Sequence, residues 1–182
     1  DVMKLQDENR IVVKEGLKRI GQTRNLGLLS LIEKNNLNPE TLTAYHIGFV
    51  IGPCLNAGGR LQTAKTALKL LMAEDPVTAD HLAGELKDLN EQRKDMTLKG
   101  TEEAIAQVEE CFQDDRVLVV FLPDCHESLA GIVAGRLREK FQKPSFVLTR
   151  SEEGVKGSGR SIEAYHMFEG LVEVKDLLTK FG

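Results

Sequence analysis

The chain has 182 residues, of which 41% are apolar and 29% charged, and its formal net charge is −4. This is enough for one ordinary domain or two small ones with a buried core. No apolar run approaches the roughly 20 residues that a bilayer-spanning helix needs, and the start lacks a signal-peptide pattern. The three cysteines show no C-x-x-C spacing and indicate reduced thiols. We therefore expect a cytoplasmic protein with no membrane partner.

The charge is unevenly distributed. Residues 126–161 contain seven lysines and arginines against four glutamates, a local charge of +3, so the rest of the chain carries −7. Such a basic region inside an acidic protein permits an anionic partner. Scattered solvated charge is the alternative interpretation.

The first 110 or so residues are predicted to be almost wholly helical. Apolar residues recur at helical spacing in residues 11–20, 26–32 and 64–71. A further apolar segment, residues 41–51, is expected to break at Gly52-Pro53 and to lead into a loop over residues 52–60. Asp75-Pro76 is expected to open the next helix, with proline in its first turn.

A long helix is predicted over residues 77–112. Its apolar residues recur at spacings of three, four and their sums, and Gly84 and Gly100 weaken the helix by about 1 kcal/mol each without ending it. At 1.5 Å per residue this segment would span roughly 50 Å, more than the width of such a domain. We expect it to connect two bodies, and the alternative is a pair of helices broken at Gly100.

The character of the sequence changes near residue 113. Residues 116–122 form a continuous β-branched and apolar run, typical of a strand covered on both faces. Ser128 is a suitable N-cap for the following helix, and residues 145–149 form a second short strand. A strand, a helix and a strand at these lengths predict a right-handed parallel βαβ unit. The expected fold class is α/β, with a helical N-terminal part, a long connecting helix and a small α/β domain.

Residues 156–161, Lys-Gly-Ser-Gly-Arg-Ser, are the clearest candidate for a binding site. Glycines let backbone N–H groups approach a ligand, and Lys156, Ser158, Arg160 and Ser161 supply only donors or positive charge. Phosphate oxygens suit such a loop. His126 follows a strand and precedes a helix, where open α/β sheets bind ligands, although a satisfied surface histidine is the alternative. The predicted loop with Asn56 and Arg60 is a weaker signal.

Three ordered motifs together carry a family resemblance. They are Gly-Pro-x-Leu-Asn-Ala-Gly-Gly-Arg-Leu (52–61), His-Glu-x-x-x-Gly-Ile-Val-Ala-Gly-Arg (126–136) and Lys-Gly-Ser-Gly-Arg-Ser-Ile (156–162). Along essentially the whole chain, they resemble the DHH phosphoesterase family, in particular its bacterial single-strand-specific 5′→3′ exonucleases. Cys54 stands where many members have arginine. The family's Asp-His-His motif is missing, and Asp1 resembles the last aspartate of its metal centre.

The resemblance implies a division of labour along the chain. Residues 1–76 would be the end of a catalytic core, residues 77–112 the connecting helix, and residues 113–182 an incomplete substrate-binding domain. Two Mn²⁺ or Mg²⁺ ions would drive phosphodiester hydrolysis, with Asp1 as the one ligand present. Single-stranded DNA with a 5′ end would be the substrate. The terminal phosphate would be bound by Asn56, Arg60, His126, Lys156, Ser158, Arg160 and Ser161.

Other interpretations remain open at this stage. A DHH phosphodiesterase acting on short oligonucleotides or cyclic dinucleotides would share these motifs. A non-enzymatic interaction module that docks on a replication partner belongs to a different class. For the exonuclease, a single-strand-binding protein is a further expected partner. The fragment by itself is expected to bind single-stranded ends weakly and to cleave nothing.

Overall fold

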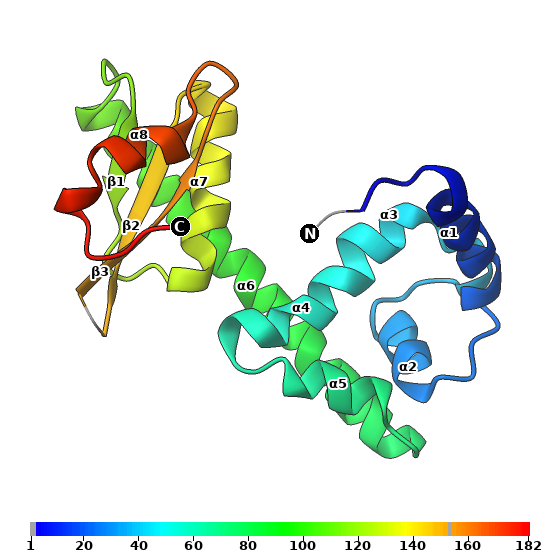
Figure 1. Ribbon diagram of the computed structural model, residues 1–182. Coiled ribbons are helices and arrows are strands. Elements are labelled where there is room, and N and C mark those ends of the chain that lie inside the picture. Colours follow the sequence, from blue (N-terminus) through cyan, green and yellow to red (C-terminus); the bar gives the residue numbers. More distant parts are fainter. Residues whose placement is uncertain (1–2, 153) are drawn as a thin grey trace. The chain divides into compact units, whose positions relative to one another are not determined.

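The computed structural model describes residues 3–152 and 154–182. Asp1, the expected metal ligand, lies outside these residues. The chain divides into two compact units, Asp1–Arg93 and Lys94–Gly182, of which the first is helical and the second is α/β (Figure 1). The expected α/β fold class is thereby confirmed. Within the described ranges, no helix is both long and apolar enough to cross a bilayer.

The first unit consists of short helices and the beginning of a long one. Its core includes Leu31, Ile32, Leu70 and Leu86, all essentially inaccessible to solvent. Gly27 allows close helix packing, since a Cβ there would lie 2.0 Å from the carbonyl oxygen of Leu70. The elements are α1 (Asp7–Ile20), α2 (Leu26–Lys34), η1 (Pro39–Thr41), α3 (Ala44–His46), η2 (Ile47–Ile51), α4 (Gly52–Leu61), α5 (Lys65–Leu71) and α6 (Pro76–Cys111).

Elements α3, η2 and α4 follow one another without an intervening loop. The predictions of a break at Gly52-Pro53 and of a loop over residues 52–60 are therefore wrong. Element η2 is a π-helical turn, in which the Gly52 N–H donates to the carbonyl of Ile47, five residues earlier. A proline interrupts an α-helix because it lacks an N–H and crowds the carbonyl four residues before it. The wider π turn accommodates Pro53 without ending the helix.

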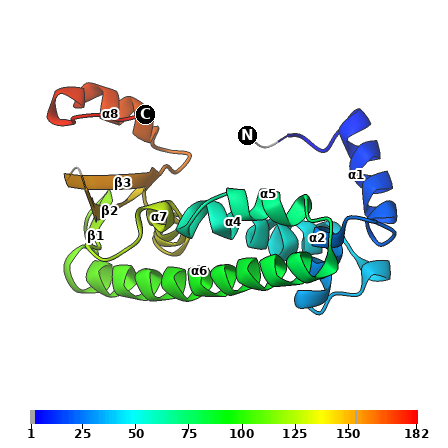
Figure 2. The same ribbon diagram turned by 90° about the horizontal axis from the view of Figure 1, so that it is seen from below.

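Helix α6 runs unbroken from Pro76 to Cys111, and Figure 2 shows its turns following one another without interruption. The Asp75 carboxylate accepts a hydrogen bond from the Thr78 N–H at 2.8 Å, so it caps the helix as its position before proline suggests. Gly100 does not break the helix. It is buried, and a Cβ there would meet the side chain of Val133 at 3.5 Å.

The second unit is built on a three-stranded sheet of order β1-β2-β3. Strands β1 and β2 are parallel neighbours connected through α7, which confirms the parallel arrangement of the predicted βαβ unit, and β3 pairs antiparallel to β2. Its elements after α6 are β1 (Leu118–Phe121), α7 (Glu127–Phe141), β2 (Ser145–Ser151), β3 (Gly154–Arg160), α8 (Met167–Glu173) and η3 (Lys175–Leu177).

One face of this sheet holds the core of the second unit. Val120 and Val147 lie on that face and pack with Val108 of α6 and Val133 of α7, all fully buried. On the opposite face, Val119 and Phe121 of β1 remain 46% and 43% exposed. The prediction that this strand is covered on both faces is therefore wrong within the described residues.

Candidate functional site

The segment 156–161, expected as a loop, is instead mostly strand. Residues 154–160 form β3 and pair along their whole length with β2. The prediction of a glycine-rich loop is therefore wrong. In a strand, side chains alternate between the two faces, so this sequence places its polar and glycine positions on opposite sides of the sheet.

The polar positions of β3 share the face covered by α7. Lys156 and Ser158 pair with Thr149 and Val147, and Arg160 pairs with Ser145. Directly opposed residues of antiparallel strands project to the same face. Since these three partners are fully buried on the core side, the ammonium, hydroxyl and guanidinium groups form one row at the rim of that side.

Gly157 and Gly159 of β3 lie on the opposite face of the sheet from Lys156, Ser158 and Arg160. A Cβ at Gly157 would lie 2.4 Å from Cδ2 of Leu148, and one at Gly159 would lie 2.3 Å from Sδ of Met167. Phe146 would also clash with the latter, at 2.7 Å. The expectation that these glycines serve the approach of a ligand is replaced by a packing reason, because apolar side chains fill their places.

Arg160 lies over the backbone of α7. A Cβ at Gly131 would stand 2.7 Å from Nη2 and 3.4 Å from Cζ of Arg160, so a side chain at residue 131 would displace the guanidinium from this position. Nη1 donates to the carbonyl of Gly159 at 2.8 Å. Ala130 and Ala134 are buried in the core of the second unit, as expected for residues that pack on the sheet.

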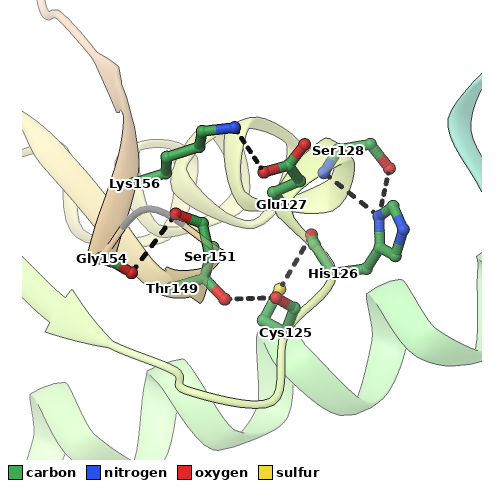
Figure 3. A network of polar contacts seen from close by, with 8 residues as sticks. All are labelled: Cys125, His126, Glu127, Ser128, Thr149, Ser151, Gly154 and Lys156. Atoms are coloured by element: carbon green, nitrogen blue, oxygen red, sulfur yellow. Dashed lines mark hydrogen bonds and ion pairs between the residues drawn. The ribbon is translucent and has the colours of Figure 1, made fainter. Parts of the chain in front are cut away.

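A cavity of about 250 Å³ opens between the first turn of α7 and β3. Lys156 reaches across it to Glu127, with an Nζ–Oε2 distance of 2.9 Å between two half-exposed side chains (Figure 3). Exposed pairs of this kind contribute about 0–1 kcal/mol, so a phosphate can compete for the lysine. The lining residues are Glu127, Ser128, Ala130, Thr149, Lys156, Gly157 and Ser158.

His126 is the N-cap of α7, a role that the sequence suggested for Ser128. Its Nδ1 accepts a hydrogen bond from the Ser128 N–H at 3.3 Å and lies 2.8 Å from the Ser128 hydroxyl. Because Nδ1 accepts, neutral His126 carries its proton on Nε2. The imidazole does not line the cavity, and Figure 3 shows it on the side of Ser128 away from Lys156.

Neighbouring polar groups are used to hold the loop before α7. The Thr149 hydroxyl donates to the carbonyl of Cys125, and the Cys125 thiol contacts the carbonyl of His126 at 3.7 Å. Burial, reinforced by the Glu103 carboxylate, raises the pKa of Cys125. A raised pKa disfavours the nucleophilic thiolate. Ser161 accepts from the Met167 N–H at 3.0 Å, which ties β3 to α8.

The remaining predicted contacts belong to the first unit. Asn56 is exposed and Arg60 half-buried on α4, four residues apart and hence on one side of that helix. The structure therefore brings the candidate residues together in two groups. Asn56 and Arg60 form one in the first unit, and Lys156, Ser158 and Arg160 form the other in the second unit.

Arg93 is a cation near Arg60 that sequence reasoning missed. Its Nε donates to Oδ1 of Asn90 at 3.1 Å, and Asn90, only 3% exposed, donates to the buried thiol of Cys54 at 3.5 Å. Burial and then the charge of Arg60 lower the pKa of the Arg93 guanidinium. The one signal in the sequence was the amide of Asn90, four residues after Leu86 in the apolar stripe of α6.

No protein-family model matches the chain, but curated sequences match it from end to end. It is 40% identical to the single-stranded-DNA-specific exonuclease RecJ of Bacillus subtilis over 184 residues, covering 100% of this chain and 23% of the relative. The RecJ of Salmonella typhimurium is 36% identical over 193 residues, with 100% and 33% covered. The chain spans a quarter to a third of the length of such relatives.

Solved structures agree with this match. The crystal structure of RecJ from Thermus thermophilus in complex with Mg²⁺ superposes with a TM-score of 0.88 at 33% identity, covering 100% of this chain and 28% of that one. An exonuclease RecJ bound to manganese gives 0.82 at 32% identity, covering 98% and 44%. Similarity in sequence and fold over the complete chain identifies it as a segment of the RecJ family.

Proposed function

We propose that this chain supplies substrate-phosphate contacts in a single-strand-specific 5′→3′ DNA exonuclease that hydrolyses phosphodiesters. The names of its relatives, single-stranded-DNA-specific exonucleases, support the single-strand exonuclease activity. The observation that carries it is the row formed by Lys156, Ser158 and Arg160 along one face of β3, beside the first turns of α7. Guanidinium, ammonium and hydroxyl donors in one row match the oxygens of a phosphate.

Each group has a distinct role in this function. Arg160, over Gly131, would donate two parallel hydrogen bonds to phosphate oxygens. Lys156 would exchange Glu127 for the phosphate, and the Ser158 hydroxyl would donate beside it. The N-terminus of α7, with its partial positive charge, adds to the attraction. His126 and Ser161 stay predicted contacts, the former through Nε2–H.

Asn56 and Arg60 on α4 are also proposed contacts of the substrate's terminal phosphate, and residues 77–112 are proposed to connect the catalytic-core and substrate-binding parts. The proposed division keeps the predicted boundaries, residues 1–76 and 113–182. Single-stranded DNA with a 5′ end is the proposed substrate, and a single-strand-binding protein a proposed partner. Such an enzyme would work in the cytoplasm, where bacterial DNA lies.

The structures of relatives contain Mg²⁺ or Mn²⁺, and these ions are the proposed cofactors. Among the described residues, no group of three or more His, Cys, Asp or Glu side chains could hold a metal ion. The role proposed for the described residues is contact with the substrate. Asp1 stays a proposed ligand, and the 182-residue chain alone is predicted not to cleave DNA.

The test compares Arg160→Ala with Arg150→Ala in the longer protein that carries this segment. Arg150 is an exposed arginine of β2 that pairs with Val155, so it lies on the opposite face of the same sheet. At low salt, Arg160→Ala should weaken binding to 5′-phosphorylated single strands by about 10-fold or more, and Arg150→Ala should not. Equal affinities for all three proteins would refute the phosphate role, because such contacts depend on ionic strength.

A further inference from the structure

Two exposed aromatic rings lie stacked on each other in the first unit. The centroids of Tyr45 and Phe49 are 5.1 Å apart with an interplanar angle of 23°, and the side chains are 62% and 68% exposed. This distance and near-parallel arrangement are those of an offset stack. Both residues therefore present large π surfaces to solvent in a fixed orientation.

The pair lies on the same helical run as two proposed phosphate contacts. Residues 44–61 are helical without a break, and Ile51, Cys54, Ala57 and Gly58 form their buried side. Tyr45, Phe49 and Asn56 are exposed and Arg60 partly so. All four therefore lie away from the buried side of this run. At 1.5 Å per residue, Phe49 and Asn56 are about 10 Å apart along the axis.

The charge of this segment suits a polyanion. Residues 41–73 contain Arg60, Lys65 and Lys69 and not a single aspartate or glutamate, although the whole chain carries −4. A nucleic-acid strand along this helix would meet no carboxylate from the helix itself. The absence of acidic residues extends over 33 positions, well beyond the aromatic pair, so the whole segment is compatible with the negative charge of a phosphate backbone.

We propose that Tyr45 and Phe49 form a stacking platform for the bases of single-stranded nucleic acid. This inference rests on the proposed function, since the strand's terminal phosphate is taken to lie at Asn56 and Arg60. About 10 Å of helix separates the platform from Asn56, a distance of the order of two nucleotides. Aromatic faces bind any base, so the platform holds the strand without reading its sequence.

Tyrosine fluorescence reports on the platform directly. The 182-residue chain has two tyrosines and no tryptophan, so in this chain Tyr165→Phe leaves Tyr45 as the single emitter. A 5′-phosphorylated oligothymidylate should quench this emission, while an abasic deoxyribose-phosphate strand of equal length should not. Absence of quenching by oligothymidylate, or equal quenching by both strands, overturns the platform. Binding that still depends on Arg160 would then leave the proposed function intact.

Affinity measurements separate stacking from packing. Phe49→Leu keeps an apolar side chain but removes the ring, so it should weaken oligothymidylate binding by about 5- to 150-fold and leave abasic binding unchanged. Tyr45→Phe keeps the ring and should bind as the parent does. Phe168→Leu, which removes an exposed ring of the second unit that contacts Phe181, is the matched control and should have no effect.

The alternative occupant is protein, either another segment of the longer chain or a second copy. Rings covered by protein would contribute to stability, so Phe49→Leu would lower the Tm of the longer protein and weaken both strands equally. That outcome overturns the platform. An unchanged Tm with a loss confined to the base-containing strand supports it.

Discussion

Gly131 of α7 and Arg160 of β3 fit against each other, with the guanidinium in the space that any side chain on residue 131 would occupy. A Cβ at Gly131 would lie 2.7 Å from Nη2 of Arg160 and 3.5 Å from Nη1. The bare helix backbone thus sets where the cation lies. A small residue in a helix and a charged residue in a strand 29 positions later form one unit of the candidate site.

Gly131→Ala should therefore weaken phosphate binding without harming the fold. The atoms that must move are the far end of a flexible side chain, and alanine gains about 1 kcal/mol over glycine in a helix. We expect unfolding to become no easier while affinity for a 5′-phosphorylated strand falls, by less than in Arg160→Ala. Gly135→Ala is the control, because a Cβ there meets no atom within 4 Å. Equal affinity in both variants would contradict the prediction.

Gly159→Ala should destabilise the second unit. The added methyl would lie 2.3 Å from Sδ of Met167 and 2.7 Å from the ring of Phe146, and overpacking of this kind costs about 1–3 kcal/mol. Urea unfolding monitored by circular dichroism measures the loss in free energy of unfolding. A variant as stable as the parent would show that the outer face of the sheet has room that its packing does not indicate.

Glu127→Gln should strengthen phosphate binding. The substitution removes the carboxylate that holds Lys156 at 2.9 Å and lowers the negative charge at the cavity. Both side chains are half-exposed, so stability should change by only about 0–1 kcal/mol. Fluorescence anisotropy at low salt should show that Glu127→Gln binds a 5′-phosphorylated strand more tightly than the parent. The same substitution should give a smaller gain in affinity when it is made in the Lys156→Ala variant. Weaker binding would mean that the ion pair orders the site rather than competing with substrate.

Cys125 should alkylate slowly at neutral pH. Burial and the Glu103 carboxylate raise the pKa of its thiol, so the reactive thiolate is scarcer at any given pH and its rate should climb only at higher pH than for an ordinary cysteine. Mass spectrometry after iodoacetamide pulses, from about pH 7 to 10, gives the profile of each peptide. Faster modification of Cys125 than of the exposed Cys111 would contradict this sign.

The parallel βαβ unit and the long helix were predictable because their signals are local and repeated. Continuous apolar runs mark β1 and β2, and recurring apolar residues mark α6 across Gly100. Strand β3 was not predictable in this way. Its glycines and charged residues have low strand propensity. The strand pairs along its whole length with β2, while Phe146, Leu148 and Met167 occupy the places that side chains at its glycines would fill. These contacts exist only in three dimensions.

The candidate site was predictable in its chemistry and less so in its geometry. The sequence indicated Lys156, Ser158 and Arg160 as donors, but only the register with β2 places them in one row. Gly52-Pro53 suggested a break because both residues have low helix propensity, and propensity alone does not reveal the π turn that lets the helix continue. Arg93 gave little local signal beyond the amide of Asn90, because the position of Arg93 depends on Asn90, which is itself held by Cys54, 36 residues before Asn90.

The π turn at Ile47–Ile51 helps to determine which way the residues before it face relative to the residues after it on the same helical run. Because an α-helix advances about 100° per residue, deleting a residue between the π turn and Asn56, in the first turn of α4, would swing Tyr45 by roughly that angle relative to Asn56. Related sequences should accordingly accept exchanges of residue type in residues 44–61 far more readily than insertions or deletions. The number of residues here, more than their identity, keeps both ends of the helix facing the same way.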